Sequence, residues 1–124
     1  GQDYFNLTWL ERFELKSYRA EDVQRSLLEL TARSIATEIN TTGCRTVYLS
    51  GGGYHNSLLV QRLVDLIPQA HLQSTDKLGV DPDFMEAMAF AWLAKQCVDG
   101  KCSGVPEVTG AVSTRILGVV FPKH

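Results

Sequence analysis

Three consecutive glycines, Gly51–Gly53, stand between an apolar run ending at Leu49 and a helical pattern starting near Ser57. Glycine has no Cβ, so this backbone can take positive φ angles and lie close against a ligand. The helix that follows has unpaired N–H groups at its start, where its dipole is positive. This arrangement predicts a nucleotide- or anion-binding site. The candidate nucleotide-binding residues are Gly51, Gly52, Gly53, His55 and Asn56.

Other interpretations of the glycine loop remain open. A tight turn that only joins strand to helix needs two residues, so three glycines exceed that need. In the dinucleotide fingerprint, Asn56 replaces the third glycine, although Asp76 follows the next strand, where a ribose-binding acid would lie. Asp76 fits a turn equally well. No Gly-Lys-Ser/Thr follows the loop, and Ser50 lacks the context of a nucleophile elbow.

Glu86 is the second candidate, because it is the only charged residue between Phe84 and Ala94. This segment is apolar around nearly its whole circumference, which predicts a helix buried between layers. With Asp81 as the N-cap and Pro82 in the first turn, Glu86 would lie beyond that turn. A buried carboxylate needs a partner. Glu86 therefore pairs with a core arginine, reaches water at a helix edge, or binds a polar substrate.

The composition is that of an ordinary globular domain, with 44% apolar and 21% charged residues. A formal charge of −2 without a basic cluster argues against nucleic acid as a partner. No apolar run reaches the length of a membrane span, and no signal peptide is evident, so we expect a cytoplasmic protein. The histidines and cysteines lack metal-ligand spacing, so no metal site is predicted. Three reduced cysteines are expected, with a Cys97–Cys102 bridge as the less favoured alternative.

The periodicity predicts an α/β chain in which two strands, each followed by a helix, pair in parallel through a right-handed crossover. The acidic residues of the long helix are expected to form a solvated face. The predicted elements are a short helix within residues 1–20, a long helix from Glu21 ended by Asn40–Gly43, a strand over Arg45–Ser50 buried on both faces, a helix capped by His55 or Asn56 and stopped by Pro68, a strand over Ala70–Thr75, a helix from Asp81 to Asp99, a loop over 99–110 and a strand over Ile116–Phe121.

Several sequence blocks follow one another along essentially the whole chain. They are Tyr4-Phe5-Asn6-Leu7, Asp22-Val23-Gln24, Glu29-Leu30-Thr31-Ala32, Gly51-Gly52-Gly53 with His55-Asn56, Gly79-Val80-Asp81-Pro82-Asp83, Glu86 to Ala94, and Val108-Thr109-Gly110-Ala111. In these blocks and their order the chain resembles the anhydro-N-acetylmuramic acid kinase family. The block from Glu86 to Ala94 is the most specific.

The resemblance implies an α/β fold that is part of an actin-like (ribonuclease H-like) ATPase lobe, with a short, mostly parallel sheet packed by helices. Family members use ATP and Mg²⁺ to hydrolyse and phosphorylate 1,6-anhydro-N-acetylmuramic acid, giving N-acetylmuramic acid 6-phosphate in bacterial cell-wall (peptidoglycan) recycling. Residues 1–124 would form the C-terminal part of the second lobe. Gly51–Gly53 and Asn56 would face the nucleotide, and Glu86 the sugar.

The chain departs from the family pattern in what it lacks. The phosphate loop Gly-Thr-Ser-Met-Asp-Gly, the Asp-Thr-Gly-Pro-Gly-Asn segment with the catalytic base, and a three-strand meander do not occur. Phosphoryl transfer requires phosphates, magnesium and nucleophile to be positioned together. We therefore predict no catalytic residue here and no activity for the chain alone. The alternatives are a stand-alone nucleotide-binding module, a subunit completed by another chain, and a structural piece without a ligand, against which the three glycines argue. An exposed strand edge would favour a homo-oligomer or pairing with the missing N-terminal part.

Overall fold

A computed structural model describes residues 4–122, which divide into two compact units. The first unit contains the described residues up to Val47 together with Gly53–Gln73. The second contains Tyr48–Gly52 and the described residues from Ser74 onward. The chain therefore passes from one unit to the other within the glycine loop.

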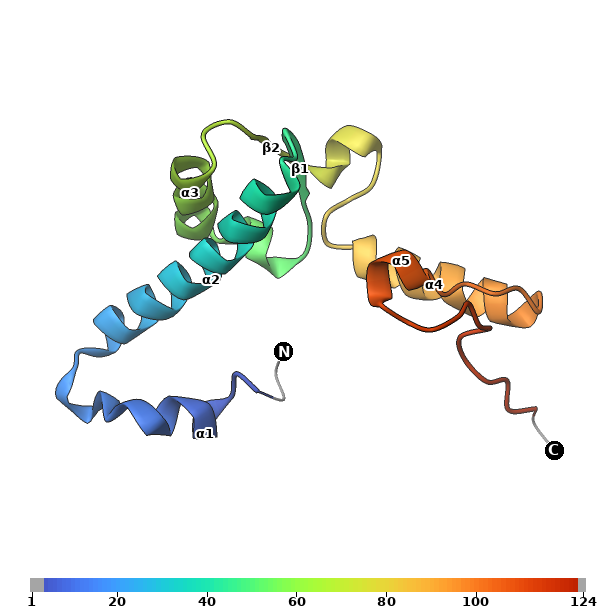
Figure 1. The fold of residues 1–124 in the computed structure, drawn as a ribbon, viewed down its shortest axis with the longest axis horizontal. Helices are drawn as coiled ribbons and strands as arrows, with labels where there is room; N and C mark the ends of the chain where they lie inside the picture. Colours follow the sequence, from blue (N-terminus) through green and yellow to red (C-terminus); the bar gives the residue numbers. More distant parts are fainter. Residues whose placement is uncertain (1–3, 123–124) are drawn as a thin grey trace. The chain divides into compact units, whose positions relative to one another are not determined.

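Helices and two short strands alternate along the chain (Figure 1). The strands β1 and β2 pair in parallel as a two-stranded sheet, and α3 connects them in sequence, which confirms the α/β class and the parallel pairing. Within residues 4–122 no helix combines the length and apolar character that crossing a bilayer requires. The elements are α1 (Leu7–Leu10), η1 (Glu11–Phe13), η2 (Leu15–Ser17), α2 (Ala20–Thr42), β1 (Thr46–Leu49), η3 (Gly52–His55), α3 (Ser57–Leu66), β2 (His71–Ser74), η4 (Thr75–Leu78), α4 (Met85–Val98) and α5 (Pro106–Thr109).

The long helix α2 is confirmed with its predicted ends. Glu21 and Asp22 lie in its first turn, where negative charge stabilises the positive end of the helix dipole. Gly43 ends the helix with φ 68°, and its N–H donates to the Ile39 carbonyl at 3.0 Å. A left-handed C-cap of this kind favours glycine because a side chain would be strained there.

The core of the first unit lies where α2 and α3 are in contact. Its buried apolar residues are Ala32 and Ala36 of α2, Leu63 of α3, and Ile67, which follows α3 and is 0% exposed. The two alanines have small side chains, so the helices can approach closely. The prediction that β1 is buried on both faces is wrong, because exposed and half-buried residues alternate along it and Tyr48 is 42% exposed. A sheet of two strands is too small to enclose either of them.

One acidic residue of α2 does not belong to a solvated face, which corrects the sequence-based expectation. Glu29 accepts hydrogen bonds from Arg62 of α3 at 2.7 and 2.8 Å and from Arg33 at 2.6 Å. The side chains of Glu29 and Arg62 are 25% and 24% exposed. The hydrogen bonds from Arg62 and then Arg33 lower the pKa of Glu29 from 4.5 to about 2, and the same pair raises the pKa of Arg62.

This pKa shift predicts acid sensitivity. The pKa of Glu29 is lower in the folded state, so its stabilising effect is fully present above pH 4.5 and is lost as the pH falls towards 2. In the protein that contains this chain, the wild type should lose more stability than Glu29→Gln across that interval. Urea unfolding midpoints at several pH values measure the difference. Parallel acid profiles for both proteins would contradict the prediction.

The second unit is built around α4, whose described residues are all at least partly exposed. Phe90 and Trp92 are 63% and 52% exposed, so the expectation that this helix is buried between layers is wrong for the chain as described. The segment Leu117–Val120 and the Phe90–Val98 side of α4 line one cavity of about 390 Å³. The remaining apolar side of α4 has no covering layer among the described residues.

Two further expectations in this unit are corrected. Ile116–Phe121 is irregular rather than a strand, and it pairs with neither β1 nor β2. The predicted loop over 99–110 contains the short helix α5, which begins at Pro106. The cysteines are free, as expected, so the Cys97–Cys102 bridge does not form.

Candidate functional site

Of the three positions, only that of Gly51 has a backbone conformation that favours glycine. Its φ is 74°, a left-handed conformation that disfavours residues with a side chain. Its N–H donates to the carbonyl of Pro82 at 2.8 Å, which fixes the start of the loop against the turn that precedes α4. Both residues belong to the second unit.

Gly52 and Gly53 have no such local reason to be glycine. They begin the 3-10 turn η3 without positive φ. A Cβ added at Gly52 would meet nothing within 4 Å, and one at Gly53 would meet only the Leu59 side chain at 3.8 Å, an ordinary contact. Within the described residues, the space over Gly52 is therefore open and the space over Gly53 is bounded only by Leu59. That space suits the close approach of a ligand, which Cβ atoms would obstruct.

The predicted N-cap of α3 was His55 or Asn56, and the structure shows that it is Asn56. Its Oδ1 accepts a hydrogen bond from the Leu59 N–H at 3.1 Å. This bond satisfies one of the free donors at the start of the helix. His55 ends η3, is exposed, and has its ring edge-to-face with Tyr54 at 5.5 Å between ring centres. Gly53, His55 and Asn56 thus lie together at the start of α3 in the first unit.

A groove of about 530 Å³ runs beside Asn56, between the first half of α2 and the start of α3. Its lining mixes apolar side chains with charged and amide groups, so it offers hydrogen-bond donors and acceptors as well as an apolar surface. The lining residues are Glu21, Gln24, Arg25, Leu27, Leu28, Thr31, Asn56, Leu58 and Leu59.

Glu86 lies in a different environment from the one predicted. The helix α4 starts at Met85, because Asp81 forms a turn before it rather than the N-cap: Asp81 Oδ1 accepts from the Asp83 N–H at 2.9 Å, and the Asp81 carbonyl accepts from the Phe84 N–H at 3.1 Å. Glu86 is therefore in the first turn of α4 and is exposed. It needs no core arginine, and its carboxylate can reach solvent or a polar ligand.

The structure distributes the candidates between the two units. Gly51, Gly52 and Glu86 belong to the second unit, whereas Gly53, His55 and Asn56 belong to the first. Asp76 lies in the first turn of η4, where its N–H donates to the Ser74 hydroxyl at 3.4 Å, so it forms part of a turn. In the described part of the chain no group of three or more His, Cys, Asp or Glu side chains could hold a metal ion.

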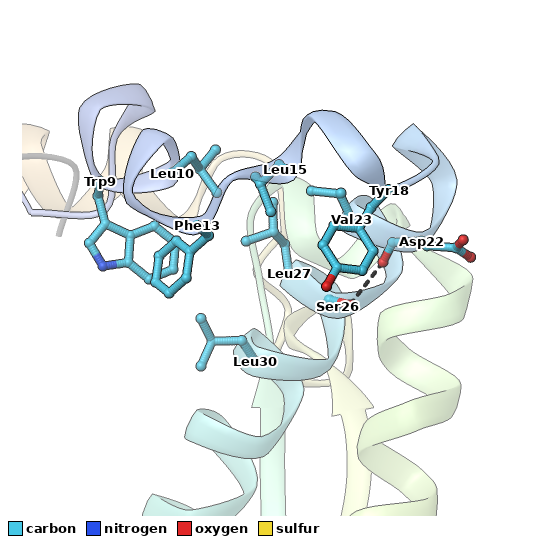
Figure 2. Close-up of a pocket in the computed structure, with 10 residues that line it drawn as sticks. All are labelled: Trp9, Leu10, Phe13, Leu15, Tyr18, Asp22, Val23, Ser26, Leu27 and Leu30. Atoms are coloured by element: carbon cyan, nitrogen blue, oxygen red, sulfur yellow. Dashed lines mark hydrogen bonds between the residues drawn. The ribbon is translucent and has the colours of Figure 1, made fainter.

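An apolar hollow of the first unit lies apart in sequence from all candidate residues. Figure 2 shows it between the N-terminal segment and the first half of α2. Its volume is about 350 Å³. Trp9 and Phe13 line it with their rings edge-to-face at 4.8 Å, and the one hydrogen bond drawn joins the Ser26 hydroxyl to the Asp22 carbonyl at 2.8 Å. The aromatic N-terminal segment and α2 thus line opposite sides of this hollow.

Comparison with known proteins gives one consistent result. The family model described as anhydro-N-acetylmuramic acid kinase matches residues 1–123. Proteins named anhydro-N-acetylmuramic acid kinase are similar to this chain at 48% identity in Pseudomonas putida, 44% in Actinobacillus pleuropneumoniae and 41% in Nitrosomonas europaea. These matches cover 98%, 99% and 98% of this chain but only 35%, 35% and 34% of the relatives. The chain therefore spans about a third of their length.

Proposed function

The chain belongs to the anhydro-N-acetylmuramic acid kinase family, and on that basis we propose that it forms the C-terminal part of the second, actin-like lobe of such a kinase. The complete enzyme would use ATP to hydrolyse and phosphorylate 1,6-anhydro-N-acetylmuramic acid to N-acetylmuramic acid 6-phosphate. It would act in the cytoplasm, in recycling of the bacterial cell wall. Its catalytic base and phosphate loop would lie in the part of the kinase outside this chain.

The observation that carries the proposal is the open backbone at Gly52 and Gly53 next to the start of α3. We assign the phosphates of ATP to this backbone, where they would meet the positive end of the α3 dipole. The nucleoside end is assigned to the groove beside Asn56, which supplies both polar groups and apolar surface. His55, exposed at the end of η3, borders the same position.

Magnesium is not assigned to residues of this chain, because the described residues lack a suitable group of metal ligands. In the complete kinase the ion would neutralise charge on the transferred phosphoryl group. We assign Glu86 to the sugar, since an exposed carboxylate in the first turn of α4 can accept hydrogen bonds from sugar hydroxyls.

Two substitutions in the full-length kinase test these assignments together. Gly52→Val should lower kcat/KM for ATP by about 100-fold, because displacing a bound substrate by about 1 Å has an effect of this size. Glu86→Gln should instead lower kcat/KM for the sugar by roughly 10-fold or more, the loss expected from a hydrogen bond to a charged group. Steady-state kinetics with each substrate varied in turn measure both effects.

Gly104→Ala is the matched control, because Gly104 also has no positive φ and its added Cβ would make only ordinary contacts, the shortest 3.5 Å to the Arg115 nitrogen. Gly104→Ala should leave both kinetic parameters close to those of the wild type. The melting temperatures of all three variants should also stay close to that of the wild type. Unchanged ATP kinetics in Gly52→Val would remove the glycine loop from the nucleotide site. Unchanged sugar kinetics in Glu86→Gln would do the same for Glu86.

Exposed apolar side chains on α4, such as Phe90 and Trp92, favour a chain that another surface completes. We propose that this surface is the remainder of the kinase on the same polypeptide. We also propose that the complete kinase forms a homo-oligomer. The alternatives are a subunit completed by a separate chain and a nucleotide-binding module without chemistry. The mass of the native polypeptide separates them: a product of 13.8 kDa in cells would favour the alternatives.

A further inference from the structure

Glu29 and Arg62 connect two helices that are far apart in sequence. The guanidinium of Arg62 donates from Nε to Glu29 Oε2 at 2.7 Å and from Nη2 to Glu29 Oε1 at 2.8 Å, and the two residues are 33 positions apart. A paired, forked contact of this type fixes orientation as well as distance. Both side chains are about three-quarters covered, so water screens the pair less than a fully exposed one.

Within α2 and α3 themselves the fully buried apolar residues are few, because Ile67, the largest fully buried side chain of the described residues, lies beyond the end of α3. On α2 only Ala32 and Ala36 are buried, and alanine offers a short, smooth surface; on α3 only Leu63 is buried. Leu63 directly follows Arg62 in sequence. Such small side chains restrain direction little, and the forked ion pair adds a directional contact between α3 and α2.

The position of the first residues of α3 depends on how the helix is oriented on α2. Arg62 lies six residues after Asn56, which corresponds to about 9 Å along the helix axis at 1.5 Å per residue. A tilt of about 10° around Arg62 would move Asn56 by roughly 1.5 Å, and a displacement of about 1 Å is enough to cost about 100-fold in a catalysed reaction. Gly53 and His55 would move with it, because they lead directly into the helix.

We infer that Glu29 and Arg62 are positioning residues for nucleotide binding: their ion pair orients α3 on α2 and thereby places Gly53, His55 and Asn56. The inference rests on the proposed function, since it assumes that these residues meet a nucleotide. Glu29 and Arg62 act through α3 and are not assigned any contact with the nucleotide.

Arg33 offers a matched control within the same cluster. Its Nε donates to Glu29 Oε1 at 2.6 Å, the oxygen that also accepts from Arg62 Nη2. Arg33 lies one turn further along α2 than Glu29, and its side chain is 66% exposed. Its removal takes away a charge and a hydrogen bond from Glu29 without touching the connection to α3.

The test uses the full-length kinase with Glu29→Gln, Arg62→Met, Arg62→Lys and Arg33→Met. The dissociation constant of ADP is measured by calorimetry, KM is measured for ATP and for the sugar, and hydrogen exchange is followed at the first amides of α3. Glu29→Gln and Arg62→Met should weaken ADP binding and raise KM for ATP by about 10-fold or more, with faster exchange at the start of α3 and an unchanged KM for the sugar. Arg62→Lys, which keeps the charge but not the fork, should lie between these variants and the wild type. Arg33→Met should stay within about twofold of the wild type.

Other results would overturn the inference. A merely structural role would lower the melting temperature and the active fraction while leaving the ADP dissociation constant unchanged. Equal weakening of ATP and sugar, or an effect of Arg33→Met as large as that of Glu29→Gln, would also contradict it. If ADP binding is normal in the ion-pair variants but weakened in Gly52→Val, the positioning role fails and the nucleotide site stands. If Gly52→Val also binds ADP normally, both fail.

Discussion

The 124-residue chain, supplied with ATP, Mg²⁺ and 1,6-anhydro-N-acetylmuramic acid, is expected to form no detectable N-acetylmuramic acid 6-phosphate. The full-length kinase under the same conditions should turn over at about 1–100 s⁻¹, the ordinary range for kinases. The chain spans 35% of the length of its relative from Pseudomonas putida. The expected loss is therefore complete rather than partial.

The physical reason is that phosphoryl transfer depends on positioning. The attacking water, the sugar, the phosphates and the metal must all be held in line, and each misplaced group multiplies the loss. The described residues offer an open glycine backbone and a helix start, but no cluster that could hold a metal ion. One side of a binding site can hold a ligand, but without the opposite side it cannot position the reacting groups relative to one another.

A coupled assay for ADP release and mass spectrometry of the sugar product measure this prediction. Adding the separately produced remainder of the kinase to the chain should restore part of the activity if the two pieces reassemble. Product formed by the chain alone would contradict the prediction and would mean that the catalytic base lies among these 124 residues. ADP binding without turnover in the full-length protein would favour the nucleotide-binding module.

Ile67→Ala is expected to have the largest effect on stability. Ile67 is 0% exposed, and truncating a buried isoleucine to alanine costs about 2–5 kcal/mol, because it removes apolar contacts and leaves a cavity. The residue also closes α3: its N–H donates to the Leu63 carbonyl at 3.0 Å, and its own carbonyl accepts from the Ala70 N–H at 2.9 Å. Poor packing there loosens the end of the helix and the turn into β2.

Hydrogen exchange in the full-length protein measures this effect locally. Amides of α2 and α3 should exchange at least about 30-fold faster in Ile67→Ala than in the wild type. This factor corresponds to a loss of about 2 kcal/mol in the free energy of unfolding. Val64→Ala, on the exposed side of the same helix and 45% exposed in the wild type, is the control and should stay within about 0.5 kcal/mol. Equal exchange in the two variants would show that Ile67 is not part of a stabilising core.

The features that the sequence predicted correctly depend on neighbouring residues. Asn56 caps α3 through the N–H three residues later, and Gly43 ends α2 in a left-handed conformation. Pro68 follows the end of α3, as its missing N–H and ring geometry require. Such signals act over one helical turn, so a single sequence contains them in full.

The incorrect predictions concern features that depend on distant partners. Periodicity showed that α4 is apolar, but burial depends on a covering layer, and Phe90 and Trp92 stay more than half exposed. The same holds for Ile116–Phe121, which is apolar enough for a strand but pairs with neither strand of the described residues. Glu29 was expected on a solvated face because its partner, Arg62, lies 33 residues away. The Asp81 turn was misplaced for a local reason, since a capping acid and an Asx turn have the same sequence signature.

The differing geometry of the three glycines has a consequence for how they evolve. Gly51 is held by its own backbone, with φ 74° and a bond to Pro82, so selection for folding alone would retain it. A Cβ at Gly52 would face open space and one at Gly53 would make only an ordinary contact with Leu59, so the fold itself does not require glycine at either position. In a lineage that kept this fold but lost its ligand, Gly51 would persist while the other two positions became free to acquire side chains.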